Sequence, residues 1–262
     1  MTDNVIQLQQ PSGGAIAALA NITVAEKAFA RLRDRGAHEP GLGVMHGPSG
    51  WGKSVAASWL MGRHAGQCYY VQADDFWTKK TMLVAICRAI GIAWQNPARK
   101  SGTPSPKSIY DMAEAIKLQL ESSRRILIID EFDYVVDKNL VESIRSLYEG
   151  SKAGILVIGE QMLPAKLRDW ERFDGRILDW FPAEAISVDG AHELARLRCP
   201  GITVEADLLA HLVGLANGSV RRVSNNLSMI RDKALSNGWD RFGLAHLGDL
   251  KLQVHTQLKG GK

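Results

Sequence analysis

Residues 47–54 read Gly-Pro-Ser-Gly-Trp-Gly-Lys-Ser and fill every fixed position of the phosphate-loop pattern G-x-x-x-x-G-K-[ST]. Glycines at 47, 50 and 52 let the backbone curl so that its N–H groups point at phosphate oxygens. In such a loop Lys53 reaches the β- and γ-phosphates, and Ser54 offers a hydroxyl to Mg²⁺. The pattern predicts a site for ATP and Mg²⁺ formed by Gly47, Pro48, Ser49, Gly50, Trp51, Gly52, Lys53, Ser54 and Val55.

The segments on either side of this loop suit a nucleotide site. Residues 42–46 form a short apolar run that predicts a buried strand, and residues 54–64 predict a helix packed on a sheet. Strand, glycine loop and helix is the setting that the motif requires, and the helix adds its positive N-terminal end. The sequence leaves open whether Trp51 covers the loop or stacks on a neighbour or a base.

Two acids follow a second apolar run. Residues 126–129 read Ile-Leu-Ile-Ile, which indicates a strand buried on both faces, and Asp130 and Glu131 come directly after it. Ligands of open α/β sheets bind at the carboxyl ends of the strands. We expect Asp130 to hold Mg²⁺ together with Ser54, and Glu131 to polarise a water for attack on the γ-phosphate.

The rest of the chain divides into a part with strands and a part with helices. Further strands are expected at 68–72, 154–159 and 178–181, and helices at 24–35, 81–90 and 109–121. After Pro182 only helices are expected, at 191–198, 205–216, 219–236 and 244–258. One strand thus lies in sequence between the loop strand and the acidic strand, which favours an ATPase over a nucleoside kinase.

This order of elements resembles the AAA+ ATPases. Within them the chain resembles the transposition ATPases of the phage Mu B-protein kind and their transposon relatives. The closer likeness rests on Ile158-Gly159 followed by a polar residue, on residues 171–176 (Glu-Arg-Phe-Asp-Gly-Arg) and on residues 218–222 (Gly-Ser-Val-Arg-Arg). The resemblance implies an α/β P-loop fold with a five-stranded parallel sheet. Its implied domains are a disordered tail (1–20), a nucleotide-binding domain (21–182) and a helical lid (183–262).

The resemblance also assigns roles to single residues. The family's first sensor, usually Asn, Thr or Ser after the fourth strand, corresponds to Glu160. Because a carboxylate there would repel phosphate, two alternatives stay open: Gln161 takes the role, or the role is absent. The arginine finger that reaches a neighbouring subunit's site corresponds to Arg176, with Arg172 as second choice. Arg221 corresponds to the lid arginine that senses bound nucleotide. Arginine suits these roles because it stays charged and donates in a planar fork.

Charge gives a further indication of an anionic partner. The formal net charge is +4, and the isoelectric point is near 9.0. Lys79 and Lys80 follow the second strand, and Arg99 and Lys100 lie in a Pro/Ser/Gly-rich loop. In the rings or filaments of such ATPases these loops tend to face the central channel, where the basic side chains could contact DNA phosphates without reading bases.

The resemblance therefore implies an ATPase that assembles on double-stranded DNA as a ring or filament and helps a transposase to choose or activate target DNA. Two alternatives stay open. One is a related ATPase that loads a helicase or initiates replication, and the other is an ATP-dependent signalling or secretion switch that does not bind DNA.

Composition sets outer limits on these expectations. The hydrophobic fraction of 45% is that of an ordinary globular protein. No apolar stretch approaches the roughly 20 residues of a membrane span, and the polar N-terminus lacks a signal-peptide core. Cys68, Cys87 and Cys199 show no metal-ligand spacing and indicate buried, reduced thiols, as expected of a cytoplasmic protein.

Overall fold

The computed structural model describes residues 20–96 and 105–254. Contacts divide the chain into two units. Ala20–Ile186 and Gly218–Arg221 belong to an α/β unit, and Ser187–Asn217 with the residues from Arg222 onward belong to a helical unit. The predicted domain boundaries at residues 20 and 182 stay a prediction, and the predicted tail lies almost wholly outside the described residues.

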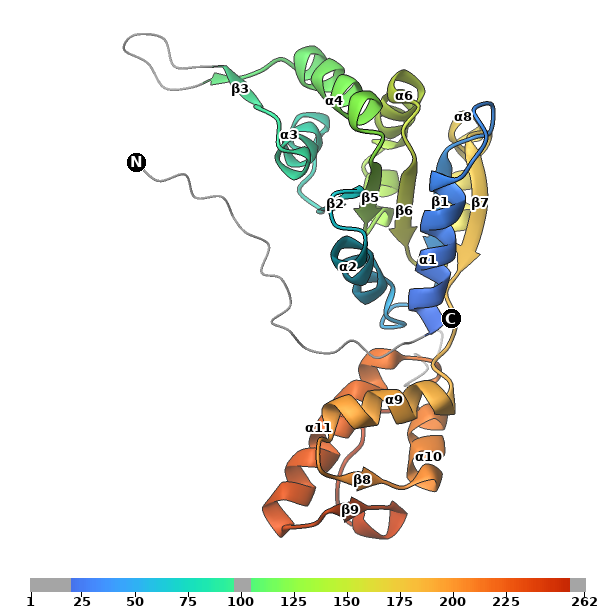
Figure 1. Cartoon of the computed structure of the whole chain (residues 1–262), viewed down its shortest axis with the longest axis vertical. Coiled ribbons are helices and arrows are strands. Elements are labelled where there is room, and N and C mark those ends of the chain that lie inside the picture. Colours follow the sequence, from blue (N-terminus) through green and yellow to red (C-terminus); the bar gives the residue numbers. More distant parts are fainter. Residues whose placement is uncertain (1–19, 97–104, 255–262) are drawn as a thin grey trace, which may run out of the picture. The chain divides into compact units, whose positions relative to one another are not determined.

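A five-stranded parallel sheet forms the centre of the α/β unit (Figure 1). Its order is β2-β5-β6-β1-β7, and every neighbouring pair runs parallel. The predicted fold class is therefore confirmed. The strands are β1 (Leu42–His46), β2 (Cys68–Gln72), β5 (Ile126–Asp130), β6 (Ile155–Gly159) and β7 (Ile177–Pro182).

Helices cover both faces of this sheet, which is why its central strands read as unbroken apolar runs. Helices α1 and α2 pack on one face and on each other. Helices α3, α4 and α6 share the core of the other face with alternate residues of the strands, such as Val44, Ile129 and Val157. The five helices are α1 (Ala20–Arg33), α2 (Lys53–Arg63), α3 (Lys79–Ile90), α4 (Ile109–Ser123) and α6 (Val141–Ser151).

Parallel pairing sets which residues lie at each edge of the sheet. The phosphate loop follows β1, Asp130 ends β5 and Glu160 follows β6, so all three lie at the carboxyl edge. Short helices α5 (Asp133–Asp137), α7 (Leu163–Arg168) and α8 (Glu171–Asp174) occupy the connections around β6 and β7.

Two details differ from the prediction for the region after β2. Helix α3 begins at Lys79 rather than at residue 81, because Thr78 and Thr81 form a reciprocal capping box at its start. Lys79 and Lys80 thus lie in the first helical turn. Residues Gln95–Asn96 (β3) pair antiparallel with Ser105–Pro106 (β4). Arg99 and Lys100 fall between them, outside the described residues.

The helical unit contains three α-helices in its described part: α9 (Val188–Arg198), α10 (Ala206–Ala216) and α11 (Val220–Asn237), whose first two residues belong to the α/β unit. The expectation of helices only is wrong here, because β8 (Thr203–Val204) pairs in parallel with β9 (Arg241–Phe242). Pairs this short leave no alternation that a sequence could reveal.

The helix predicted at 244–258 is also wrong in its described part, which holds only a 3₁₀ turn, η1 (Leu244–His246), and no helix from 247 to 254. Gly248 adopts a positive φ of 48°, and Lys233 Nζ bonds to the carbonyl of Leu247 at 2.7 Å. Farther on, the Asn226 side chain bonds to both the backbone N–H and the carbonyl of Gln253. These bonds replace those of a helix.

The three cysteines are buried thiols, as predicted. Burial raises the pKa of each thiol to about 11, which makes the reactive thiolate scarce.

Candidate nucleotide site

The phosphate loop joins β1 to α2 through two residues in the left-handed region. Gly50 has a φ of 80° and Gly52 a φ of 91°, which side chains with a Cβ rarely adopt. Gly52 is the N-cap of α2 and provides no side-chain cap to the first turn. The N–H groups of that turn can therefore serve an anion, as the sequence predicts.

Lys53 is buried at the start of α2. Its Nζ donates to the carbonyl oxygens of Gly47 at 2.7 Å and Pro48 at 3.0 Å, so the side chain folds back along its own loop. Burial lowers the pKa of Lys53, and the charges of Asp130 and Glu131 oppose this shift. The two predicted halves of the site thus lie within electrostatic range of each other.

Asp130 ends β5 with only 2% of its surface exposed. One carboxylate oxygen accepts from the backbone N–H of Glu131 at 2.8 Å, and the other accepts from the Tyr70 hydroxyl at 3.1 Å. Tyr70 lies on β2, the strand next to β5. No sequence motif points to Tyr70, because only the pairing of two strands brings it to an acid 60 positions away.

Glu131 lies in a strained backbone conformation. Its φ of 54° places it in the left-handed region, which costs a non-glycine residue on the order of 1 kcal/mol. The side chain is half-buried, and burial, followed by the nearby charge of Asp130, raises its pKa. Strain and a raised pKa in one carboxylate are features that gather at functional sites.

Glu160 follows β6, where the family's sensor is expected. Its side chain is exposed, while its backbone N–H donates to Oδ2 of Asp133 at 2.6 Å. Asp133 also forms an ion pair with Lys166 at 3.2 Å. Gly159 must lack a side chain, since a Cβ there would come within 2.5 Å of the same Asp133 oxygen. Asp133 thus fixes the end of β6, a role that no sequence motif signalled.

Trp51 packs inside its own chain. A Cβ on Gly218 would lie 2.6 Å from the indole, so ring and glycine are in direct contact. The Trp51 carbonyl accepts from the side chain of Asn21 at 2.7 Å, and Asn21 also bonds to the backbone N–H and carbonyl of Glu184. Of the alternatives left open, the structure favours a tryptophan that covers the loop. No sequence motif points to Asn21 either.

Arg221 meets the phosphate loop through the short segment that belongs to the α/β unit. Its backbone N–H donates to the carbonyl of Gly50 at 3.0 Å, and its side chain is exposed. The predicted nucleotide-sensing arginine therefore lies beside the loop whose ligand it would sense.

Arg176 lies at the amino edge of the sheet, where the strands begin, and the phosphate loop lies at the carboxyl edge, where they end. The carbonyl of Arg176 accepts from the N–H of Leu42, at the start of β1. The five residues of β1 rise about 3.3 Å each, so roughly 15 Å of strand separates this position from its own phosphate loop. Arg172 lies in α8, just before the same position. The structure thus brings neither arginine to the site of its own chain.

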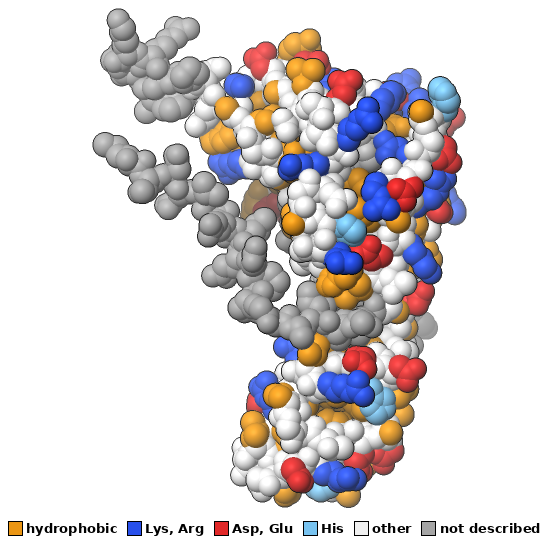
Figure 2. Space-filling view, in the orientation of Figure 1, with side chains coloured by type: hydrophobic (Ala, Val, Ile, Leu, Met, Phe, Trp, Pro, Cys, Tyr) orange, Lys and Arg blue, Asp and Glu red, His pale blue; other side chains and the backbone are white. Residues whose placement is uncertain are grey.

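The predicted DNA-contacting lysines are exposed in the first turn of α3. In the turn before them Phe76 is 86% exposed, and Asp75 pairs with Lys138 at 2.9 Å. On the face seen in Figure 2, Lys and Arg side chains are mixed with Asp and Glu side chains over the α/β unit. The structure gathers no group of three or more His, Cys, Asp or Glu for a metal in the residues it describes.

A glycine loop after β1 of a parallel sheet, with a buried lysine close to two acids at the end of β5, defines a P-loop nucleotide-binding protein. The AAA domain family profile matches residues 35–167, just over half of the 262 residues. The chain belongs to the AAA domain family and is a P-loop ATPase, a class that generally uses ATP and Mg²⁺.

Solved structures agree with this assignment at the level of the fold. Orc1 of Aeropyrum pernix in complex with DNA matches with a TM-score of 0.61 and 17% identity, over 88% of this chain and 63% of that one. Cdc6p of Pyrobaculum aerophilum gives 0.59 and 15%, over 92% and 68%. The branch migration motor RuvB of Thermotoga maritima gives 0.55 and 15%, over 88% and 68%. No curated protein matches the chain.

No helix within residues 20–96 and 105–254 has the length and apolar character needed to cross a membrane.

Proposed function

We propose that this ATPase binds double-stranded DNA without sequence preference, assembles on it when ATP is bound, and assists a transposase in target selection. One observation carries the assembly step. Lys53, Asp130 and Glu131 meet at the carboxyl edge of the sheet, whereas Arg176 projects from the amino edge. A second copy would supply the arginine that each site lacks.

The nucleotide would lie on the phosphate loop, with Lys53 turning from its loop carbonyls to the β- and γ-phosphates. The donors near the loop fit Mg²⁺, since Ser54 and Asp130 offer the hard oxygen ligands that this ion prefers. Bound Mg²⁺ would neutralise charge on the phosphates. Glu131 would orient the attacking water, and Arg221 would contact the nucleotide from the segment that touches Gly50.

In this arrangement Arg176 acts in trans. An arginine supplied by a neighbouring copy stabilises the charge that develops on the γ-phosphate. ATP binding would favour the assembled form because only the triphosphate reaches both surfaces. Hydrolysis would favour release from DNA.

DNA would contact the same assembly through Lys79 and Lys80, whose charges lie at the start of α3. Arg99 and Lys100 would add to this surface, although they lie outside the described residues. That the similar Orc1 of Aeropyrum pernix was solved in complex with DNA supports the idea that this fold can engage a duplex. Lysines on phosphates give affinity that is sensitive to salt and insensitive to sequence.

The test is fluorescence anisotropy with a labelled random duplex over a series of salt concentrations. With a non-hydrolysable ATP analogue we expect tight binding that weakens steeply as salt rises. Replacing both Lys79 and Lys80 by alanine should reduce the slope of log affinity against log salt by about two. The matched control is Arg33→Ala, which removes an exposed charge from the end of α1.

Binding that ignores nucleotide, or a complete lack of binding, would support the signalling or secretion switch instead. A pull-down with purified partners separates the remaining alternatives. We expect retention of a transposase. Retention of a replicative helicase alone would indicate a loader.

A further inference from the structure

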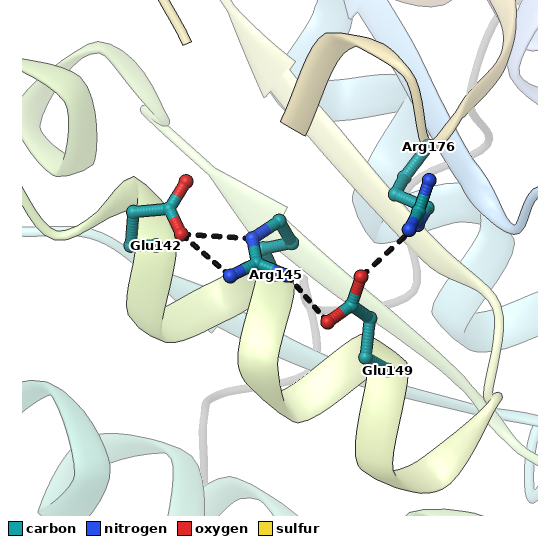
Figure 3. A network of polar contacts seen from close by, with 4 residues as sticks. All are labelled: Glu142, Arg145, Glu149 and Arg176. Carbon is teal, nitrogen blue, oxygen red and sulfur yellow. Dashed lines mark hydrogen bonds and ion pairs between the residues drawn. The ribbon is translucent and has the colours of Figure 1, made fainter. Parts of the chain in front are cut away.

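An alternating series of charges runs along α6 and ends at Arg176 (Figure 3). Arg145 donates to Glu142 at 2.8 Å through Nε and also to Glu149 through Nη1. Glu149 in turn accepts from Nε of Arg176 at 3.0 Å. Positions 142, 145 and 149 share one face of the helix because they are three and four residues apart.

Glu149 divides its two carboxylate oxygens between the two arginines. Oε2 accepts from Arg145 and Oε1 accepts from Arg176. Burial alone would raise the pKa of Glu149, but the bonds and charges of the two arginines outweigh it and lower the pKa. The carboxylate is therefore held in its ionised form between two cations.

The series is fixed at one end and open at the other. The Arg145 side chain is 17% exposed and bound on two sides, whereas that of Arg176 is 47% exposed. The backbone of Arg176 is fixed as well, because its N–H donates to Phe173 and its carbonyl accepts from Leu42. A guanidinium held through Nε keeps the two terminal nitrogens of its planar fork for the oxygens of an anion such as a phosphate.

The second candidate for the arginine finger has no such support. Arg172 is exposed in α8, and within the described residues no ion pair or side-chain hydrogen bond of Arg172 is found. Its side chain would have to be ordered each time it met a phosphate, which weakens binding and catalysis.

We propose that Glu149 is a positioning residue for catalysis by the assembled protein. It holds Arg176 through Nε and directs the terminal nitrogens toward the γ-phosphate bound by the neighbouring copy. The inference rests on the proposed function, in which Arg176 acts in trans. Arg145 holds Glu149 in turn.

The experiment measures ATP hydrolysis by the full chain on duplex DNA. Arg176→Ala should lower kcat by about a thousandfold. Glu149→Gln should lower kcat by roughly tenfold through misplacement of the guanidinium, with the KM for ATP changed by less than about twofold. Glu193→Gln is the matched control, because Glu193 forms an i,i+3 ion pair with Arg196 within α9 and is no part of the series that ends at Arg176, and it should stay near the wild-type rate. In the Arg176→Ala background, Glu149→Gln should add no further loss.

A mixing experiment separates positioning from general damage to the fold. Arg176→Ala copies keep an intact nucleotide site but lack the arginine. Glu131→Gln copies should be unable to hydrolyse ATP, but in a mixed assembly they would supply Arg176 to the sites of the Arg176→Ala copies. Adding Glu149→Gln to the Glu131→Gln copies should lower the restored rate by the same tenfold or so, although the change lies in the inactive copy.

The outcomes distinguish the trans-acting role of Arg176 from the positioning role of Glu149. If Arg176→Ala keeps the wild-type kcat, the trans-acting arginine of the proposed function fails. If Arg176→Ala loses activity while Glu149→Gln equals Glu193→Gln, the proposed function stands and the positioning role is overturned. A further loss from Glu149→Gln in the Arg176→Ala background would likewise overturn it, by indicating a structural role.

Discussion

Asp130 shows how single residues prepare the nucleotide site. Both of its carboxylate oxygens accept hydrogen bonds, from Tyr70 and from the N–H of Glu131. Burial and the charge of Asp130 raise the pKa of the Tyr70 phenol, so this hydroxyl remains a donor. The proposed Mg²⁺ ligand is therefore held in one orientation by its own strand and by the strand beside it.

Replacing Tyr70 by phenylalanine should destabilise the protein in a way that ligand reverses. A buried carboxylate that loses a donor costs about 1–3 kcal/mol of unfolding free energy. In saturating Mg²⁺ and ATP the loss should shrink, because the ion would then satisfy the carboxylate. Urea unfolding with and without ligand measures both values.

Tyr69 provides the control for this substitution. It lies next to Tyr70 on β2, and its hydroxyl accepts from the neutral amide of Gln119 at 3.2 Å. Tyr69→Phe should cost a similar or smaller amount that ligand does not reverse. A Tyr70→Phe deficit that is unchanged by Mg²⁺ and ATP would show that the hydroxyl has no connection with the metal site.

Single site residues could be predicted from the sequence where they belong to a motif, and not where they act through contacts between distant segments. Lys53 and the acids at 130 and 131 belong to patterns of fixed spacing, because the chemistry demands them there. Tyr70, Asn21 and Asp133 hold those groups through contacts between segments far apart in the chain. No local pattern records such contacts, so these three residues could not be found from the sequence.

At the scale of elements, the phosphate loop is held by the segment 218–221 as well as by β1 and α2. Arg221 and Ser219 both approach the carbonyl of Gly50, and Gly218 contacts the indole of Trp51. These contacts of residues 218–221 support the conformation of the loop. A substitution that disturbs them should therefore lower the affinity of the loop for a nucleotide.

Gly218→Ala tests this contact. Gly218 has a φ of 79°, where alanine costs about 1 kcal/mol, and its Cβ would come within 2.6 Å of Trp51. Overpacking adds about 1–3 kcal/mol. We expect the free energy of unfolding to fall by the sum of both costs, and ATP affinity, measured by calorimetry, to fall with it.

Gly238→Ala is the control for Gly218→Ala, because the two glycines have similar backbone conformations but only Gly218 is in close contact with another side chain. Gly238 has a φ of 68° and no neighbour within 4 Å of a built Cβ. Gly238→Ala should lower the free energy of unfolding by the backbone cost alone, and the protein should keep its affinity for ATP. Equal effects of the two substitutions on ATP affinity would contradict a packing role for Trp51 at the loop.

Elements were predictable where burial shaped the sequence. The central strands β5 and β6 read as apolar runs because helices cover both faces of the sheet. The helix expected at 244–258 failed because the side chain of Asn226 bonds to the backbone of Gln253, and such a bond leaves no periodic signal. The start of α3 was missed by two residues because a Thr-Thr capping box departs from the usual Ser/Thr and Glu pair.

At the scale of the whole molecule, the nucleotide site and the proposed arginine finger lie at opposite ends of the parallel strands. The carboxyl edge of the sheet carries the phosphate loop and the acids, and its amino edge carries Arg176 with its support from Glu149. If Arg176 acts on a nucleotide, as proposed, this arrangement requires the nucleotide to be bound by another copy. ATP binding, assembly and DNA retention should therefore rise and fall together.

The most direct measurement is the mass of the protein–DNA complex, determined by light scattering during gel filtration with duplex DNA and ATP. Glu131→Gln, which should bind ATP without hydrolysing it, is expected to elute as a species with several protein copies on each duplex. Lys53→Ala, which should lose the triphosphate, is expected to elute as single copies apart from the DNA. Equal masses for the two variants, or a Glu131→Gln complex that is indifferent to ATP, would contradict an assembly closed by nucleotide.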